Sequence, residues 1–151
     1  MLKPLNEKGT LRILYATSLA WFIAQGLKVL IYWIRNHKIN FRLFVGTGGM
    51  PSSHSAFVSC LATAIGLETG WSSPVFLLSL GIAIVIMSDA AGVRRAAGQQ
   101  AKILNEIMDD FYSSRPVPQK RLKELLGHTP VQVFVGAFIG FLTAVVLYQL
   151  K

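Results

Sequence analysis

Charged residues are scarce in this sequence, and acidic residues are the scarcest. Charged side chains occupy 15% of the 151 positions and hydrophobic ones 52%, which excludes an ordinary soluble domain of this size. The 7 Asp and Glu face 15 Lys and Arg, which gives a formal net charge of +8. The composition therefore predicts one compact integral membrane domain over residues 1–151 with an excess of positive charge.

The sequence contains one cysteine, and no cleavable signal is evident in it. The single cysteine, Cys60, lies inside an apolar segment, so no internal disulfide can form and a buried, inert thiol is expected. Residues 1–10 are polar, and the first apolar run is too long for a signal peptide and lacks a small-residue cleavage site. We therefore expect this run to be a membrane helix.

Four apolar runs are present, at Leu11–Ile34, Ala56–Leu67, Val75–Ser88 and Val131–Leu150. The first and last have about twenty residues or slightly more, which is enough to span a bilayer. The middle two have about twelve to fourteen, which alone fits a re-entrant or buried segment, but each approaches spanning length when its flanks are included. The sequence thus predicts an all-α fold, a small polytopic bundle of four membrane helices.

A charged amphipathic segment follows the third apolar run. Over Gly92–Phe111, apolar residues recur at helical spacing opposite polar ones, so the third helix is expected to continue into water. The apolar positions are Val93, Ala97, Ala101, Leu104, Met108 and Phe111. The prolines of Ser113–Gln119 mark a turn-rich linker, and a short basic helix ending near Gly127 is predicted after it.

The cations are placed unevenly along the chain. Most lie in two loops, one before Pro51 and one from Asp89 to Pro130, whereas few lie near the termini. By the positive-inside rule these loops face the cytoplasm and both termini face away from it, as in a multi-pass protein of a bacterial inner membrane. The cations flank membrane segments without interleaved aromatic residues at base-stacking spacing, so we expect anionic membrane lipids as partners and no nucleic acid.

A loop suited to binding phosphate precedes the second apolar run. It reads Gly48-Gly49-Met50-Pro51-Ser52-Ser53-His54-Ser55. Glycines such as Gly49 allow backbone N–H groups to turn toward an anion, and Ser52 and Ser53 can donate hydrogen bonds. The following helix points its positive N-terminal end at the same place. His54 then stands where an imidazole can transfer a proton.

A second histidine stands in a matching position. His128 follows a glycine and a basic segment and precedes the last apolar run. Two apolar segments separate it from His54, so an even number of membrane crossings returns both imidazoles to one face. A lone interfacial histidine is more often a structural hydrogen-bonding group, but two in matched Gly, Ser, Thr and Pro surroundings favour chemistry. His37 lacks such surroundings and is expected to be solvated.

These segments resemble the type-2 phosphatidic acid phosphatase superfamily, which includes the vanadium-dependent haloperoxidases, and most closely its small divergent membrane branch. Pro51-Ser52-Ser53-His54 is similar to the Pro-Ser-Gly-His motif, with serine in place of glycine. His128 to Gly136 is similar to the His-x-x-x-Asp-Val-x-x-Gly motif, with Gln132 in the aspartate position. Asp89 to Arg95 resembles a signature of the divergent branch, and the resemblance as a whole covers roughly Gln25 to Gly140.

The resemblance implies a group of cations around a bound phosphate. Lys28 and Arg35 have the spacing of the superfamily's first motif, although Asn36 stands where a proline is expected. Lys28 also lies within an apolar run, where a cation is costly and either faces a polar cavity or extends to the interface. Leu122 replaces the arginine expected six residues before the histidine of the third motif. The phosphate-binding residues implied by the resemblance are Lys28, Gly49, Ser52, Ser53, Arg94 and Arg95.

The resemblance further implies a two-step phosphoryl transfer without a metal or other cofactor. His128 would attack phosphorus to form a phosphohistidine, His54 would protonate the leaving oxygen, and water would then hydrolyse the intermediate. Gln132 can still accept a hydrogen bond from the His128 ring, but it stabilises an imidazolium less well than a carboxylate does. Asp89 is expected to compensate by orienting His128 or the arginine pair, with a plain ion pair to an arginine as the alternative.

The leading hypothesis is therefore an enzyme, an integral membrane phosphatase acting on a lipid phosphate or diphosphate such as phosphatidylglycerophosphate, phosphatidate or a polyprenyl diphosphate. The competing hypothesis is a non-catalytic membrane protein that retains an anionic-lipid-binding site. Haloperoxidase activity is not expected, because it would need bound vanadate. Gly136 and Gly140 have G-x-x-x-G spacing on the last helix, which permits close helix packing within the chain or in a homodimer.

Overall fold

The computed structural model describes residues 6–38, 44, 49–112, 122 and 127–150, and their regular secondary structure is helical throughout. The helices are α1 (Glu7–Asn36), α3 (Ser53–Thr69), α4 (Pro74–Ala91), α5 (Val93–Tyr112) and α6 (Pro130–Gln149). Three stretches are long and apolar enough to cross a membrane, at Glu7–Asn36, Pro74–Asp109 and Pro130–Gln149. The predicted all-α polytopic membrane bundle is confirmed for this part of the chain.

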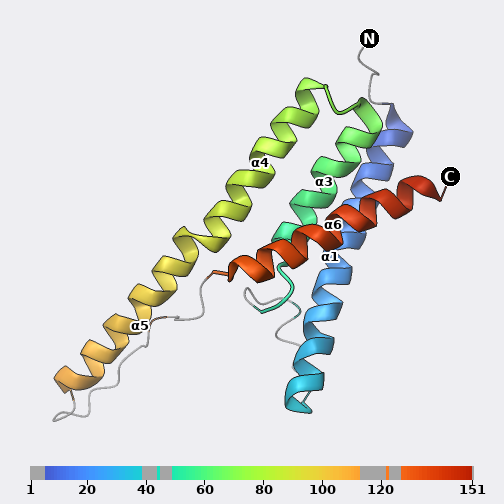
Figure 1. Ribbon diagram of the computed structural model, residues 1–151. Coiled ribbons are helices and arrows are strands. Elements are labelled where there is room, and N and C mark those ends of the chain that lie inside the picture. The colour runs from blue at the N-terminus through green and yellow to red at the C-terminus, as the bar shows by residue number, and fades with distance from the viewer. Residues whose placement is uncertain (1–5, 39–43, 45–48, 113–121, 123–126, 151) are drawn as a thin grey trace.

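The second apolar run forms α3, which lies at the centre of the bundle and contacts α1, α4 and α6 (Figure 1). Its 17 residues correspond to about 25 Å of helix, less than the roughly 30 Å of a hydrocarbon core. Small side chains such as Ala56, Cys60 and Ala64 are fully buried along it. Of the four predicted membrane helices, three therefore reach spanning length on their own, and α3 is the buried helix that they surround.

The bundle helices begin at polar caps that the sequence supplies. Ser52, Ser73 and Thr129 cap α3, α4 and α6, and each side chain accepts a hydrogen bond from a backbone N–H of the first turn. A proline follows the cap of α4 and of α6, at a position where its missing N–H removes no helical hydrogen bond. Capping therefore determines where α3 and α6 begin, close to the two histidines.

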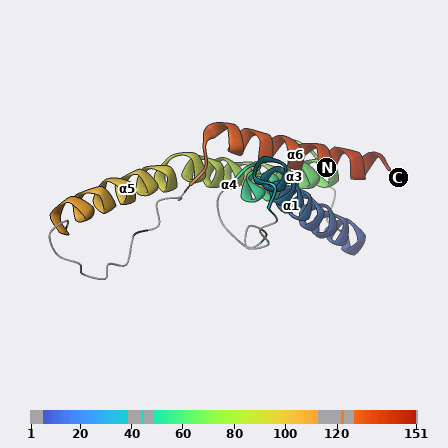
Figure 2. The ribbon, with the colours of Figure 1, turned by 90° about the horizontal axis from the view of Figure 1, so that it is seen from below.

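α4 and α5 form a long, nearly continuous rod that leaves the bundle (Figures 1 and 2). Gly92 separates them, and its N–H donates to the Ser88 carbonyl at 2.8 Å. The predicted continuation of the third membrane helix is thus present. Ala101 is buried, whereas other members of the predicted apolar face are exposed, namely Val93, Leu104 and Met108. The predicted linker and basic helix between α5 and Gly127 lie outside the described residues, apart from Leu122.

The closest packing in the bundle joins α3 to α6. Gly136 and Gly140 face the backbone of α3, and a β-carbon at either position would overlap a carbonyl oxygen, that of Ser52 or that of Ala56. The Ser59 hydroxyl also donates to an α6 carbonyl at 2.8 Å. The G-x-x-x-G spacing therefore serves packing within the chain.

Gly140→Ala should destabilise the protein by about 1–3 kcal/mol, because the added methyl group has no space between the two helix backbones. The measurement is thermal or denaturant unfolding of the purified protein in detergent. Gly81→Ala on α4 is the matched control, since a β-carbon there meets nothing within 4 Å and alanine has the higher helix propensity. Equal stability of the two variants would contradict the packing described here.

Candidate functional site

The starts of α3 and α6 are joined by backbone hydrogen bonds. The Ser52 N–H donates to the Gln132 carbonyl at 3.1 Å. The His128 N–H donates to the Ala90 carbonyl at the end of α4, at 2.9 Å. Three segments that are distant in sequence therefore meet at one end of the bundle. This meeting brings His54, at the first turn of α3, and His128, before α6, to the same end of the molecule.

His128 is held in one orientation and one tautomer by Gln132. The side chain of His128 is buried, and its Nδ1 lies 3.3 Å from the Gln132 Oε1. The same oxygen accepts the Thr129 N–H at 3.0 Å as part of the capping box of α6. Because a backbone N–H can only donate, the atom facing both groups is the amide oxygen, so Nδ1 carries the ring proton. Nε2 then keeps its lone pair and is the nucleophilic atom of the ring.

The His128 ring is kept neutral by its surroundings. Burial lowers the pKa of His128 below its ordinary value of 6.5, and the hydrogen bond with Gln132 raises it in part. The charges of Lys28, His54 and Arg94 lower the pKa further. The surface of His54 is exposed, in contrast to that of His128, but partial burial and the charges of Arg94 and Lys28 lower the pKa of His54 as well. The site thus combines a buried neutral imidazole with a second imidazole that is open to its surroundings.

A cationic cavity of about 200 Å³ lies beside Gln132. Lys28 and Arg35 of α1 both line it, and Lys28 is only 3% exposed. Gly49 lines it as well, at φ +83°, and a β-carbon there would stand 3.3 Å from the Lys28 side chain. Arg35 was not among the predicted binding residues. Its signal in the sequence is the seven-residue spacing from Lys28, which is two helical turns and places both cations on one face.

Asp89 contacts an arginine, while Gln132 contacts His128. The Arg94 Nε lies 2.6 Å from the Asp89 Oδ2, and both side chains are partly exposed. The charge of Arg94 acts on both imidazoles, so the ion pair lies at the edge of the site. Arg95 is exposed, and its backbone packs against Gly127, whose φ is +84°.

The serine-rich turn before α3 presents backbone N–H groups, rather than serine hydroxyl groups, to an anion. Ser52 is fully buried, and its Oγ accepts from the N–H and the hydroxyl of Ser55 at 3.3 and 3.0 Å. Ser53 is 3% exposed. The first-turn N–H groups of Ser53 and His54 have no acceptor within their own helix, and they point out of the positive end of α3. An anion at this end would therefore meet amides, as at other helix N-termini.

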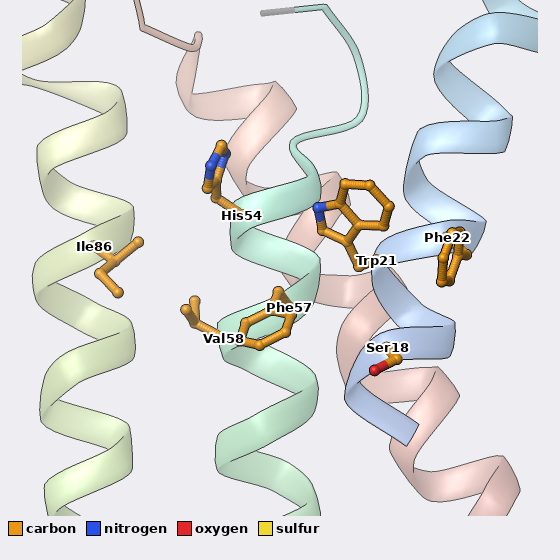
Figure 3. Close-up of a pocket in the computed structure, with 7 residues that line it drawn as sticks. All are labelled: Ser18, Trp21, Phe22, His54, Phe57, Val58 and Ile86. Carbon is orange, nitrogen blue, oxygen red and sulfur yellow. The ribbon is translucent and has the colours of Figure 1, made fainter. Parts of the chain in front are cut away.

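A second cavity adjoins His54, and the sequence did not predict it. It has a volume of about 410 Å³ and lies between α1, α3 and α4 (Figure 3). Trp21, Phe22 and Phe57 supply aromatic rings to its wall. Within the described residues, no group of three or more His, Cys, Asp or Glu side chains is placed to hold a metal ion.

These features define a polytopic helical membrane protein with two histidine-bearing turns beside a cationic cavity. A family model described as the Divergent PAP2 family matches residues 10–143. The chain is also similar to a Bacillus subtilis (strain 168) protein described as "Uncharacterized membrane protein YuiD", with 44% identity over 143 residues that cover 87% of this chain and 90% of that protein. The chain therefore belongs to the Divergent PAP2 family, as its motifs predicted. No solved structure matches it.

The stability of the protein should fall as the pH is lowered below about 6.5, the ordinary pKa of histidine. The pKa of His128 is lower in the folded protein, so the unfolded chain binds the proton more tightly and acid favours unfolding. Above that pH the contribution of the neutral His128 ring to the stability of the fold is fully present. The measurement is unfolding in detergent between pH 8 and pH 5.

His128→Gln should make this pH dependence shallower without removing it, because burial and the charges of Arg94 and Lys28 also lower the pKa of His54. His37→Asn should leave it unchanged, because His37 is exposed and its left-handed backbone conformation suits asparagine. An identical slope for His128→Gln and the unmodified protein would show that His128 does not titrate as described.

Proposed function

We propose that this protein is a membrane phosphatase that hydrolyses a lipid phosphate or diphosphate through a phosphohistidine on His128. The observation that carries the proposal is the contact of Gln132 with the Nδ1 of His128, which leaves the Nε2 lone pair of a buried, neutral ring available. A neutral imidazole in one fixed tautomer is what nucleophilic attack on phosphorus requires.

The first step would transfer the phosphoryl group to the protein. The Nε2 of His128 attacks phosphorus, and the bond from phosphorus to the leaving oxygen breaks. Protonated His54 gives its proton to that oxygen. Lys28 and Arg94, whose charges act on both histidines, would stabilise the charge of the transition state, together with Arg35 of the adjoining cavity and the first-turn amides of α3.

The second step would regenerate the enzyme. Neutral His54 takes a proton from a water molecule, and the resulting nucleophile attacks the phosphorus of the phosphohistidine. The bond from nitrogen to phosphorus breaks, inorganic phosphate leaves, and His128 returns to the tautomer that Gln132 holds. The proton that His54 takes from water restores its protonated form, so the two steps need no other acid or base.

Membership in a family of membrane proteins and the spanning helices support a lipid as the substrate. Its hydrocarbon would remain in the bilayer while the phosphate reaches the end of the bundle where the histidines lie. The excess of Lys and Arg in the loops at this end supports a site on the cytoplasmic side, by the positive-inside rule, and we propose a bacterial inner membrane as the location.

Purified protein in detergent should release phosphate from lipid phosphates, and His128→Ala should lower the rate by a factor of roughly 10³ or more, because the nucleophile is lost. His54→Gln should lower it by about 10²–10⁴ through loss of the acid. Acid-labile radioactive phosphate should be trapped on the active protein. His37→Gln is the control and should be fully active.

Phosphate release that survives His128→Ala would exclude His128 as the nucleophile. Tight binding of lipid phosphates with no release by the unmodified protein would support a non-catalytic lipid-binding protein instead.

Gln132→Leu should lower kcat by about 10- to 100-fold, because the group that fixes the His128 tautomer is lost. Gln132→Glu keeps both acceptor contacts and should retain most of the activity. Asp89→Asn should retain activity within a few-fold, since the partly exposed ion pair with Arg94 contributes little. Steady-state rates at several pH values provide the measurement, and a larger loss in Asp89→Asn than in Gln132→Leu would reverse the roles given to these residues.

A further inference from the structure

The apolar pocket beside His54 adjoins the histidine site. Figure 3 shows His54 on α3 with Phe57 and Val58 one turn further along the same helix, facing Ile86 of α4 and the aromatic rings of α1. His54 itself lines the pocket, so the group that would donate the proton stands at the junction of the polar site and an apolar cavity.

The polar and apolar cavities occupy successive parts of α1. The cationic cavity is lined by residues from Lys28 to Asn36, and the apolar pocket by Ser18, Trp21 and Phe22. Lys28 lies six residues beyond Phe22, which corresponds to about 9 Å along the helix axis. A ligand that spans both cavities therefore has its anionic group toward the end of α1 and its hydrocarbon toward the middle of the bundle.

The proposed chemistry specifies which part of the substrate occupies the pocket. If the proposed function is correct, His54 protonates the oxygen that links phosphorus to the lipid, and the atoms attached to that oxygen lie on the His54 side. In this pocket the other polar groups of the lining residues are the Ser18 hydroxyl and the Trp21 indole N–H. Hydrocarbon must therefore follow the linking oxygen almost immediately.

A diacylglycerol leaving group fits this lining poorly. It would place two ester groups and a chain branch beside the linking oxygen, in a pocket walled mainly by Phe22, Phe57, Val58 and Ile86. Carbonyl oxygens that lose water without gaining a donor weaken binding. An isoprenoid alcohol brings only carbon and hydrogen to the same place, and its planar, methyl-bearing double bonds can pack against aromatic rings.

We infer that the substrate is a single-chain isoprenoid phosphate whose first units occupy the pocket at His54. In the transfer step the bond from phosphorus to the isoprenoid oxygen breaks as the bond from phosphorus to Nε2 of His128 forms. The proton of His54 goes to that oxygen, so the products of the full cycle are an isoprenoid alcohol and inorganic phosphate.

The experiment compares farnesyl monophosphate, dioleoyl phosphatidate and the tailless p-nitrophenyl phosphate in the same detergent micelles. We expect kcat/KM for farnesyl monophosphate to exceed that for phosphatidate by about tenfold or more. Phe57→Ala should raise KM for farnesyl monophosphate by about tenfold, because an aromatic wall is lost, whereas Phe138→Ala should leave the hydrolysis of all three substrates unchanged. Phe138→Ala is the matched control, since Phe138 is 61% exposed on α6 and does not line the pocket.

Two results would overturn the inference while leaving the proposed function intact. One is His128-dependent hydrolysis of phosphatidate as efficient as that of farnesyl monophosphate, and the other is equal behaviour of Phe57→Ala and Phe138→Ala. If none of the three substrates is hydrolysed in a His128-dependent manner, the proposed function fails. Calorimetric measurement of lipid binding to the His128→Ala variant then tests the occupant of the pocket separately. Farnesyl monophosphate that binds more tightly than phosphatidate, and more weakly after Phe57→Ala, supports an isoprenoid occupant. Equal binding of the two lipids refutes it.

Discussion

Close contact between α3 and α6 is the constraint on which the rest of the site depends. The absence of side chains at Gly136 and Gly140 lets the two helix backbones meet, so the Ser52 N–H can reach the Gln132 carbonyl. That hydrogen bond joins the turn before α3 to the first turn of α6. The nearness of the two histidine-bearing turns is thus a consequence of helix packing, and neither ring has to hold the other in place.

The length of α3 has a further consequence for where the site lies. A helix of about 25 Å is at the short limit of lengths that cross a bilayer, so an end of α3 can lie beneath the headgroups. Backbone groups at such an end need partners inside the protein. The Ser52 cap and the Ser52–Gln132 hydrogen bond supply them at the His54 end. This arrangement allows a polar turn and an apolar pocket to share His54.

Hydropathy predicted most of the fold, and motif spacing predicted that the two histidine-bearing turns lie at one end of the bundle. The run Leu11–Ile34 became α1, and Val75–Ser88 became α4, each extended by a few residues at capped or frayed ends. The central position of α3 was not predictable, because a short apolar run has the same pattern whether it spans or is buried. The pocket at His54 depends on the rotation of helices about their axes, which local pattern does not determine. For Asp89 the sequence left open an ion pair with an arginine or contact with His128, and the structure shows the ion pair with Arg94.

The neutral Gln132 has a physical logic of its own in a site with this charge. The charges of Lys28 and Arg94 act on both histidines, Arg35 lines the cavity beside Gln132, and Asp89 pairs with Arg94 at the edge of the site. A carboxylate at position 132 would stabilise an imidazolium, but it would also cancel part of the field that attracts an anion. Glutamine keeps the acceptor that fixes the His128 tautomer and the start of α6 without adding negative charge. In the proposed mechanism, the negative charge that stabilises any protonated form of His128 would therefore come from the phosphate of the substrate.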